Sequence, residues 1–115
     1  MITGLHTILF SQDADRVRAF LADVLGFDSV DAGGGWLIFG PLPPGELAVH
    51  PSEESKHELY LMCDDVERTV EELEAKGVEL AGPINDEGWG RLTAIKLPGG
   101  GELGLYEPRH PSPIV

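Results

Sequence analysis

The chain has 115 residues, of which 42% are hydrophobic and 24% charged, as expected for one ordinary globular domain spanning residues 1–115. Twenty acidic residues against eight Lys and Arg give a formal net charge of −12. Such a surface repels phosphate backbones and anionic lipids, so we expect neither a nucleic-acid partner nor a membrane partner.

The first half, residues 1–52, has the pattern of a βαβββ module. Alternating apolar residues predict a strand over 2–10. An apolar face at helical spacing predicts a helix over 14–25, which Asp13 is placed to cap and Gly26 to end. Three short strands are then predicted at 27–31, 35–39 and 46–50, with the glycine triplet 33–35 as a turn between them.

The second half, residues 55–108, repeats this plan. A strand is predicted over 58–62 and a helix over 66–76, with Asp64 and Glu67 at capping-box spacing and Gly77 at its end. Further strands are predicted at 78–81, 91–97 and 102–106, with the glycines from Gly99 as a hairpin turn, and residues 109–115 as an extended tail.

Two internal repeats support the duplication. A shift of 52 positions places His6 on Glu58, and the stretch GELAVHP recurs as GELGLYEP. The predicted fold class is therefore α+β, with two tandem βαβββ modules whose curved mixed sheets form a cleft. A ferredoxin-like βαββαβ domain is the alternative, and the three strand signals after each helix argue against it.

Strand alternation predicts which side chains face this cleft. Each module covers one face of its sheet with its helix, so the other face is left to line the cleft. The predicted cleft-facing residues are His6, Ile8, Phe10, Glu46, Ala48, His50, Glu58, Tyr60, Met62, Glu102, Gly104 and Tyr106. Imidazoles and carboxylates among small and aromatic neighbours are typical of a site for a small molecule or a metal ion.

These features together resemble a known superfamily. A βαβββ duplication that opens with LHTILF, continues with ELYLMCDDVERTVEELEAKGVE and ends with GGGELGLYEP resembles the vicinal oxygen chelate superfamily. That superfamily includes glyoxalase, extradiol dioxygenases and bleomycin-binding resistance proteins. The resemblance spans about Gly4 to Pro108, and it is more specific for the fold than for the activity.

The resemblance implies where a divalent metal would bind. His6 and Glu58 match the ligand positions on the first strand of each module, but the last-strand positions that normally carry Glu are Ala48 and Gly104. A displaced site of His6, His50 and Glu58 for Fe, Mn, Zn or Ni is one hypothesis, with Glu46 and Glu102 as nearby substitutes. A metal-free ion pair between His6 and Glu58 is the other.

Two classes of function remain open at this point. The favoured one is a protein that binds or sequesters a small molecule, with Phe10, Trp36, Tyr60, Met62 and Tyr106 lining the pocket. The alternative is a metal-dependent lyase, isomerase or dioxygenase acting on vicinal oxygens, in which Glu58 or Glu102 would serve as the catalytic base. His57 and His110 are assigned no role.

The remaining expectations concern partners and location. The superfamily resemblance and the sheet edges that such a cleft leaves uncovered predict a homodimer. The single cysteine, Cys63, excludes an internal disulfide and is interpreted as a small buried residue, and the N-terminus lacks the pattern of a signal peptide. We therefore expect a cytoplasmic protein with a small-molecule ligand.

Overall fold

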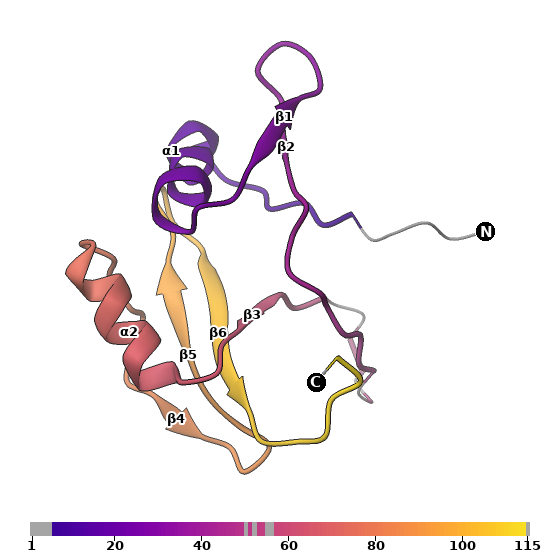
Figure 1. The fold of residues 1–115 in the computed structure, drawn as a ribbon, viewed down its shortest axis with the longest axis vertical. Helices are drawn as coiled ribbons and strands as arrows, with labels where there is room; N and C mark the ends of the chain where they lie inside the picture. The colour runs from indigo at the N-terminus through magenta and orange to yellow at the C-terminus, as the bar shows by residue number, and fades with distance from the viewer. Residues whose placement is uncertain (1–5, 50, 52, 55–56, 115) are drawn as a thin grey trace.

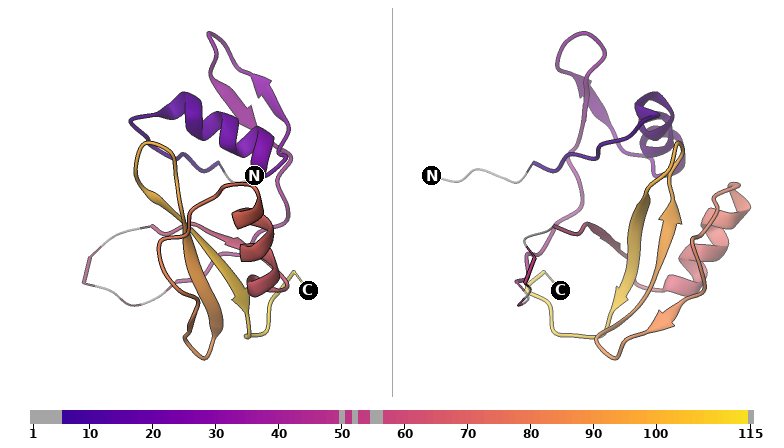
Figure 2. Two further views of the ribbon diagram at one scale, coloured as in Figure 1. Left: turned by 90° about the vertical axis from the view of Figure 1, so that its left-hand side faces the viewer. Right: turned by 180° about the vertical axis from the view of Figure 1, so that it is seen from behind.

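The computed structural model describes residues 6–49, 51, 53–54 and 57–114 and has an α+β fold, which confirms the predicted fold class (Figure 1). The N-terminal part holds α1 (Ala14–Ala19), the π-helical turn η1 (Phe20–Val24) that continues it, and a hairpin of β1 (Ser29–Asp31) and β2 (Leu37–Phe39). Figure 2 shows this helix and hairpin at one end of the molecule, with the larger sheet and α2 at the other.

The C-terminal part holds a complete βαβββ arrangement. It comprises β3 (Tyr60–Met62), α2 (Val66–Ala75), β4 (Asn85–Asp86), β5 (Gly90–Lys96) and β6 (Glu102–Pro108). The four strands form one sheet in the order β3-β6-β5-β4, in which β3 runs parallel to β6 and the other pairs are antiparallel. The sheet is open rather than closed into a barrel, and the tandem repetition of this plan in the first half is not directly confirmed.

The core lies between α2 and one face of this sheet, with η1 closing one end. Its buried members come from η1 and α2 on one side and from β5 and β6 on the other: Phe20, Val66, Leu73, Ile95, Leu103 and Leu105. Leu103 and Leu105 are alternate residues of β6, as expected of a sheet with one face in the core. None of the helices in the described part of the chain is long and apolar enough to span a membrane.

The helix termini follow local sequence chemistry, with one correction. The side chain of Asp65 caps α2 by accepting a hydrogen bond of 3.1 Å from the backbone N–H of Arg68. The predicted capping pair of Asp64 and Glu67 is therefore wrong, because the residue that caps α2 is Asp65, one position after Asp64. Asp13 precedes α1 as expected but makes no side-chain cap, and Gly26 adopts the left-handed conformation with φ of 73°.

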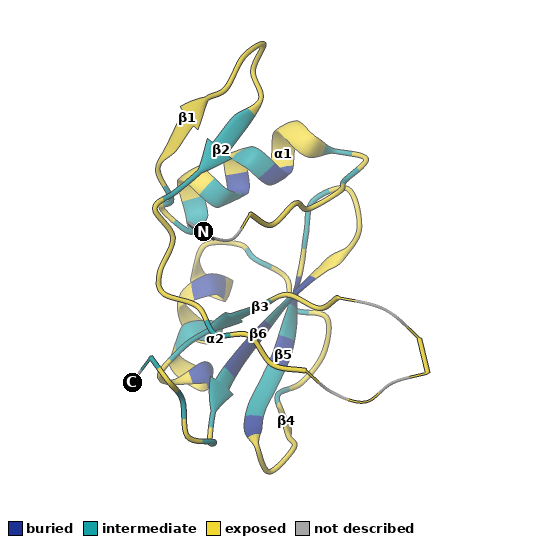
Figure 3. Cartoon of the chain, turned by 90° about the vertical axis from the view of Figure 1, so that its right-hand side faces the viewer, coloured by how far each residue is buried: buried dark blue, intermediate teal, exposed yellow. Residues whose placement is uncertain are grey.

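The predicted strands over 2–10 and 46–50 are wrong where the structure describes them, because residues 6–10 and 46–49 are not in strands. Residues 6–10 and 47–49 are exposed throughout (Figure 3). A strand needs a neighbour to accept and donate its backbone hydrogen bonds, and within the described residues of one chain these segments have none. The strand expected at 78–81 is reduced to one bridge, Leu80 to Ile95, and β4 was not predicted.

Candidate functional site

The face of the four-stranded sheet that points away from α2 is called the open face here. Along β6, Leu103 and Leu105 belong to the core, so the alternate residues Glu102, Gly104 and Tyr106 point to the open face. The register pairs Tyr60 with Gly104. The alternation predicted from the sequence therefore holds for β3 and β6.

A hollow of about 570 Å³ lies on the open face and brings together several predicted site residues. Glu58, Tyr60, Glu102 and Gly104 line it, and its volume lies in the range of pockets that hold small organic molecules. The other lining residues are His57, Leu59, Ala81, Gly82, Pro83, Asn85, Leu92, Thr93 and Ala94. Two carboxylates and an aromatic ring thus share one concave surface.

Tyr60 is positioned from two sides. Its hydroxyl donates a hydrogen bond of 2.9 Å to Oε2 of Glu58. Its ring lies so close to Gly104 that a Cβ at position 104 would be 2.3 Å from Cδ1 of Tyr60. Burial and the hydrogen bond to Glu58 raise the pKa of the Tyr60 phenol, so this hydroxyl stays protonated and remains a donor at neutral pH.

Tyr106 is the buried centre of a polar network that joins distant parts of the chain. Its hydroxyl donates to Oε1 of Glu46 over 2.8 Å and lies 3.2 Å from Nε2 of His110, while Ser112 donates to Oε2 of Glu46 over 2.6 Å. Burial, followed by the bond to Glu46, raises the pKa of Tyr106 to about 12. The hydrogen bonds from Ser112 and Tyr106 lower the pKa of Glu46, which stays ionised.

Aromatic rings gather around Tyr106 beside the hollow. Tyr60 and Trp89 meet it edge to face, with ring centroids 5.6 Å and 5.8 Å away, and the His110 ring stacks on it at 6.1 Å. Such edge contacts stabilise an arrangement of rings beyond the area they bury. Trp89 remains 47% exposed and so offers an aromatic surface at the edge of the site.

The structure places the other predicted residues outside the hollow. His6 is exposed in the extended segment before α1, Phe10 is 91% exposed, and Trp36 is 52% exposed in the turn of the β1–β2 hairpin. Met62 lies half-buried in β3, in register with Tyr106. His50 lies outside the described residues.

The described residues do not fit a metal centre within one chain. Across residues 6–49, 51, 53–54 and 57–114, no three His, Cys, Asp or Glu side chains are close enough together to hold an ion. The two positions at which a carboxylate ligand is missing differ in environment: Ala48 is exposed, whereas Gly104 lies under the ring of Tyr60. A metal site composed of His6, His50 and Glu58 stays a prediction.

Sequence reasoning missed the network around Tyr106. Glu46 was in the predicted cleft-facing set, but its partners His110 and Ser112 lie in a tail that was expected to be only extended. Nothing local in EPRHPSPIV indicates that this tail returns to a segment 60 and more residues earlier. Trp89 was not among the predicted pocket residues, and the one sequence signal that marks it is the pair Gly88-Trp89, which repeats Gly35-Trp36.

Comparisons with known proteins agree with this architecture. The model of the Glyoxalase/Bleomycin resistance protein/Dioxygenase superfamily matches residues 4–108. The uncharacterized protein YetH of Bacillus subtilis (strain 168) is 26% identical over 109 residues, covering 84% of this chain and 91% of YetH.

Solved structures show the same fold. TnmS3, an antibiotic binding protein from Streptomyces sp. CB03234, is 26% identical with a TM-score of 0.62, covering 94% of this chain and 99% of TnmS3. A lactoylglutathione lyase from Agrobacterium tumefaciens is 18% identical with a TM-score of 0.64, covering 91% of this chain and 92% of the lyase. At that identity the likeness to the lyase concerns the fold alone.

Proposed function

The chain belongs to the Glyoxalase/Bleomycin resistance protein/Dioxygenase superfamily, and from this premise we propose that it binds a small, planar, cationic organic molecule in the hollow of the open face. The observation that carries the proposal is the pairing of two carboxylates, Glu58 and Glu102, with the ring of Tyr60 around one hollow. Carboxylates attract a cation electrostatically, and aromatic rings bind both its positive charge and its flat surface.

The surroundings of the hollow favour a positive ligand over a negative one. The whole chain carries a formal charge of −12, which raises the local concentration of cations and repels anions. Of the residues that line the hollow, two are acidic, none is Lys or Arg, and one is the exposed His57. The antibiotic-binding TnmS3, at 26% identity, is a relative for which binding a small molecule is the stated role.

The alternative, a metal-dependent lyase, isomerase or dioxygenase, has less support. It requires a ligand set that the described residues of one chain do not bring together. The likeness to a lactoylglutathione lyase at 18% identity does not extend to chemistry. Glu58 accepts a hydrogen bond from the hydroxyl of Tyr60, so its carboxylate already holds a position in the wall of the hollow.

Two acridines that differ in charge test the proposal. We expect 9-aminoacridine, a planar cation at neutral pH, to quench the fluorescence of Trp89 and to bind more tightly than acridine, which has the same rings and is mostly neutral. Trp36→Phe leaves Trp89 as the reporting tryptophan. Equal affinity for the two acridines would contradict the electrostatic part of the proposal.

Variants then locate the binding. Glu58→Gln and Glu102→Gln remove one charge each, and the amide introduced by Glu58→Gln keeps an oxygen that accepts the bond from Tyr60. Each variant should weaken 9-aminoacridine binding about two- to fivefold, the effect of one partly screened charge pair. Glu72→Gln is the matched control, because Glu72 lies on α2 and its carboxylate pairs with Arg68 at 3.4 Å. This variant should leave the affinity for 9-aminoacridine unchanged. An equal loss in the control would place the ligand elsewhere.

We infer also that the protein acts as a homodimer. Phe10 and Val49 are each 91% exposed and Leu47 is 84% exposed, all in extended segments without strand partners in the described chain. Apolar side chains on unpaired extended backbone favour pairing with another chain. A second copy offers the same segments with the symmetry that a dimer uses.

A further inference from the structure

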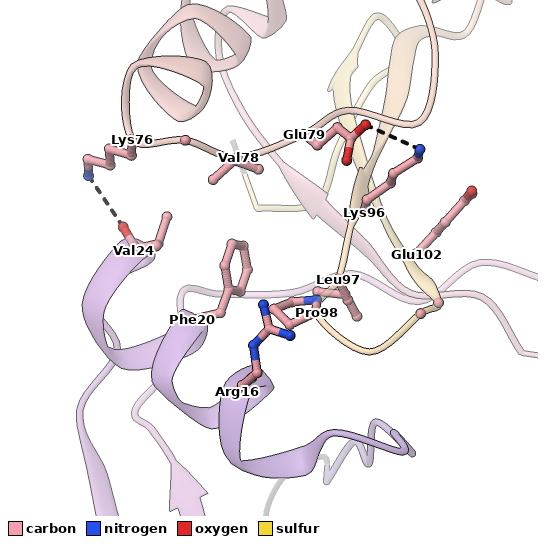
Figure 4. Close-up of a pocket in the computed structure, with 13 residues that line it drawn as sticks. Arg16, Phe20, Val24, Lys76, Val78, Glu79, Lys96, Leu97, Pro98 and Glu102 are labelled. Atoms are coloured by element: carbon pink, nitrogen blue, oxygen red, sulfur yellow. Dashed lines mark hydrogen bonds and ion pairs between the residues drawn. The ribbon is translucent and has the colours of Figure 1, made fainter.

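A second hollow, of about 820 Å³, lies where the two parts of the chain meet (Figure 4). It is bounded by α1 and η1 on one side and by the end of α2 and the β5–β6 turn on the other. Glu102 is the residue it shares with the hollow of the open face. Its lining is otherwise separate and has a different chemistry.

Basic side chains are concentrated around this second hollow. The chain has eight Lys and Arg residues against twenty acidic ones, and three of the eight, Arg16, Lys76 and Lys96, line it. In a protein of net charge −12, a surface with three cations and two carboxylates, Glu79 and Glu102, is a local exception. An anion is therefore repelled less here than over the rest of the surface.

Two of these cations are available to a ligand. Lys96 is paired with Glu79 at 3.4 Å, so these two charges offset one another. Lys76 instead donates to the backbone carbonyl of Val24 over 3.3 Å, and the described residues place no carboxylate within ion-pair distance of it. Arg16 contacts Oδ2 of Asp13, three residues earlier at the start of α1, at 3.4 Å, but its side chain stays 71% exposed and accessible to a ligand.

The orientation of the side chains supports this assignment. Figure 4 shows the Arg16 guanidinium directed from the helix toward Phe20 and Pro98, into the space between the two parts of the chain. The Glu102 carboxylate is drawn on the far side, pointing away from Arg16. An anion bound beside Arg16 would therefore lie nearer to the guanidinium than to the carboxylate of Glu102.

The floor of the hollow is apolar. It is formed by side chains from η1, from the segment after α2 and from the β5–β6 turn, namely Phe20, Val24, Val78, Leu97 and Pro98. Burying such surface under a hydrocarbon chain is favourable in proportion to the area covered. The site thus combines an apolar floor with two cations at its edge.

We propose that this second hollow binds an amphipathic organic anion, a carboxylate with a hydrocarbon body, at a site independent of the open face. The carboxylate lies beside Arg16, whose planar guanidinium provides two parallel donors, and Lys76 adds positive charge at the opposite edge of the hollow, where its ammonium donates to the carbonyl of Val24. The hydrocarbon body lies on Phe20 and its apolar neighbours. A bound molecule of this kind joins α1 to the end of α2 and so stabilises the contact between the two parts of the chain.

Octanoate is the probe, and methyl NMR provides the location. Octanoate should shift the methyl signals of Val24 and Val78 in a saturable way while leaving those of Leu92, in the hollow of the open face, unchanged. Octylammonium, with the same chain and the opposite charge, should not shift Val24 or Val78. An absence of octanoate shifts at these two valines, or equal shifts with octylammonium, would overturn the proposal.

Matched variants test the two cations. Arg16→Gln should raise the octanoate dissociation constant about three- to tenfold and Lys76→Gln about two- to fivefold, whereas Arg16→Lys, which keeps the charge but loses the two parallel donors, should have a smaller effect than Arg16→Gln. Arg18→Gln and Arg68→Gln lie on the same two helices, at residues that do not line the hollow, and should have no effect. Equal losses in these controls would show a general charge effect and refute the site. The acridine titration reports on the other hollow, so the two proposals fail separately.

Discussion

Replacing Gly104 with alanine tests the central contact of the open face. A Cβ at position 104 would lie 2.3, 2.7 and 3.0 Å from Cδ1, Cε1 and Cγ of Tyr60, all below ordinary van der Waals distance. The Tyr60 ring must therefore move by about 1 Å or more, which disturbs its edge contact with Tyr106 and its hydrogen bond to Glu58. Overpacking of this kind costs about 1–3 kcal/mol in the free energy of unfolding.

A double-mutant cycle separates this collision from other effects of the substitution. Gly104 does not have a positive φ, so alanine adds no backbone strain and by itself should stabilise the strand by about 0.5–1 kcal/mol. Gly104→Ala should therefore destabilise the natural protein but be neutral or stabilising in a Tyr60→Ala background. Urea unfolding of the four proteins measures the coupling. An equal cost of Gly104→Ala in both backgrounds would refute the role of the Tyr60 ring.

Three further predictions concern packing, titration and assembly. Leu73→Ala should cost about 2–4 kcal/mol in urea unfolding because Leu73 is 7% exposed in the core, and Leu21→Ala should cost less because Leu21 is only partly buried; the reverse order would contradict the placement of η1. The pKa of Tyr106 is raised to about 12 from about 10 in the unfolded chain, so its stabilising contribution is complete below pH 10 and is lost between about pH 10 and 12. Tyr106→Phe should therefore reduce the fall of the free energy of unfolding with pH in this range, and an unchanged slope would contradict the shift. Light scattering should give about twice the 12.4 kDa chain mass, and Phe10→Ser with Val49→Ser should shift the protein toward monomer, whereas a natural protein that is monomeric at all concentrations would exclude the dimer.

Local patterns were sufficient for much of the second half. The apolar face of residues 66–76 predicted α2, and Gly77 marks its end because glycine adopts the left-handed conformation without steric cost. Alternation in 58–62 and 102–106 predicted that Glu58, Tyr60 and Glu102 share a face. A strand places every second side chain on the same side whatever surrounds it, so the common direction within each segment follows from sequence periodicity, whereas the pairing of β3 with β6 that brings them together is tertiary.

The same reasoning was insufficient for strands that depend on a distant neighbour. The segments 6–10 and 46–49 have strand-like patterns but are not strands in the described chain. Alternation states which face a side chain would occupy, but it does not supply the backbone partner that makes a strand.

The contacts between distant segments were decided by the tertiary structure. Tyr106 meets Glu46 across 60 residues, His110 stacks on Tyr106, and the bare backbone at Gly104 admits the ring of Tyr60. Arg16 and Lys76 likewise line one hollow from two different helices. Sequence periodicity specifies directions within one element, whereas these distances depend on how loops return and elements pack, which no local pattern encodes.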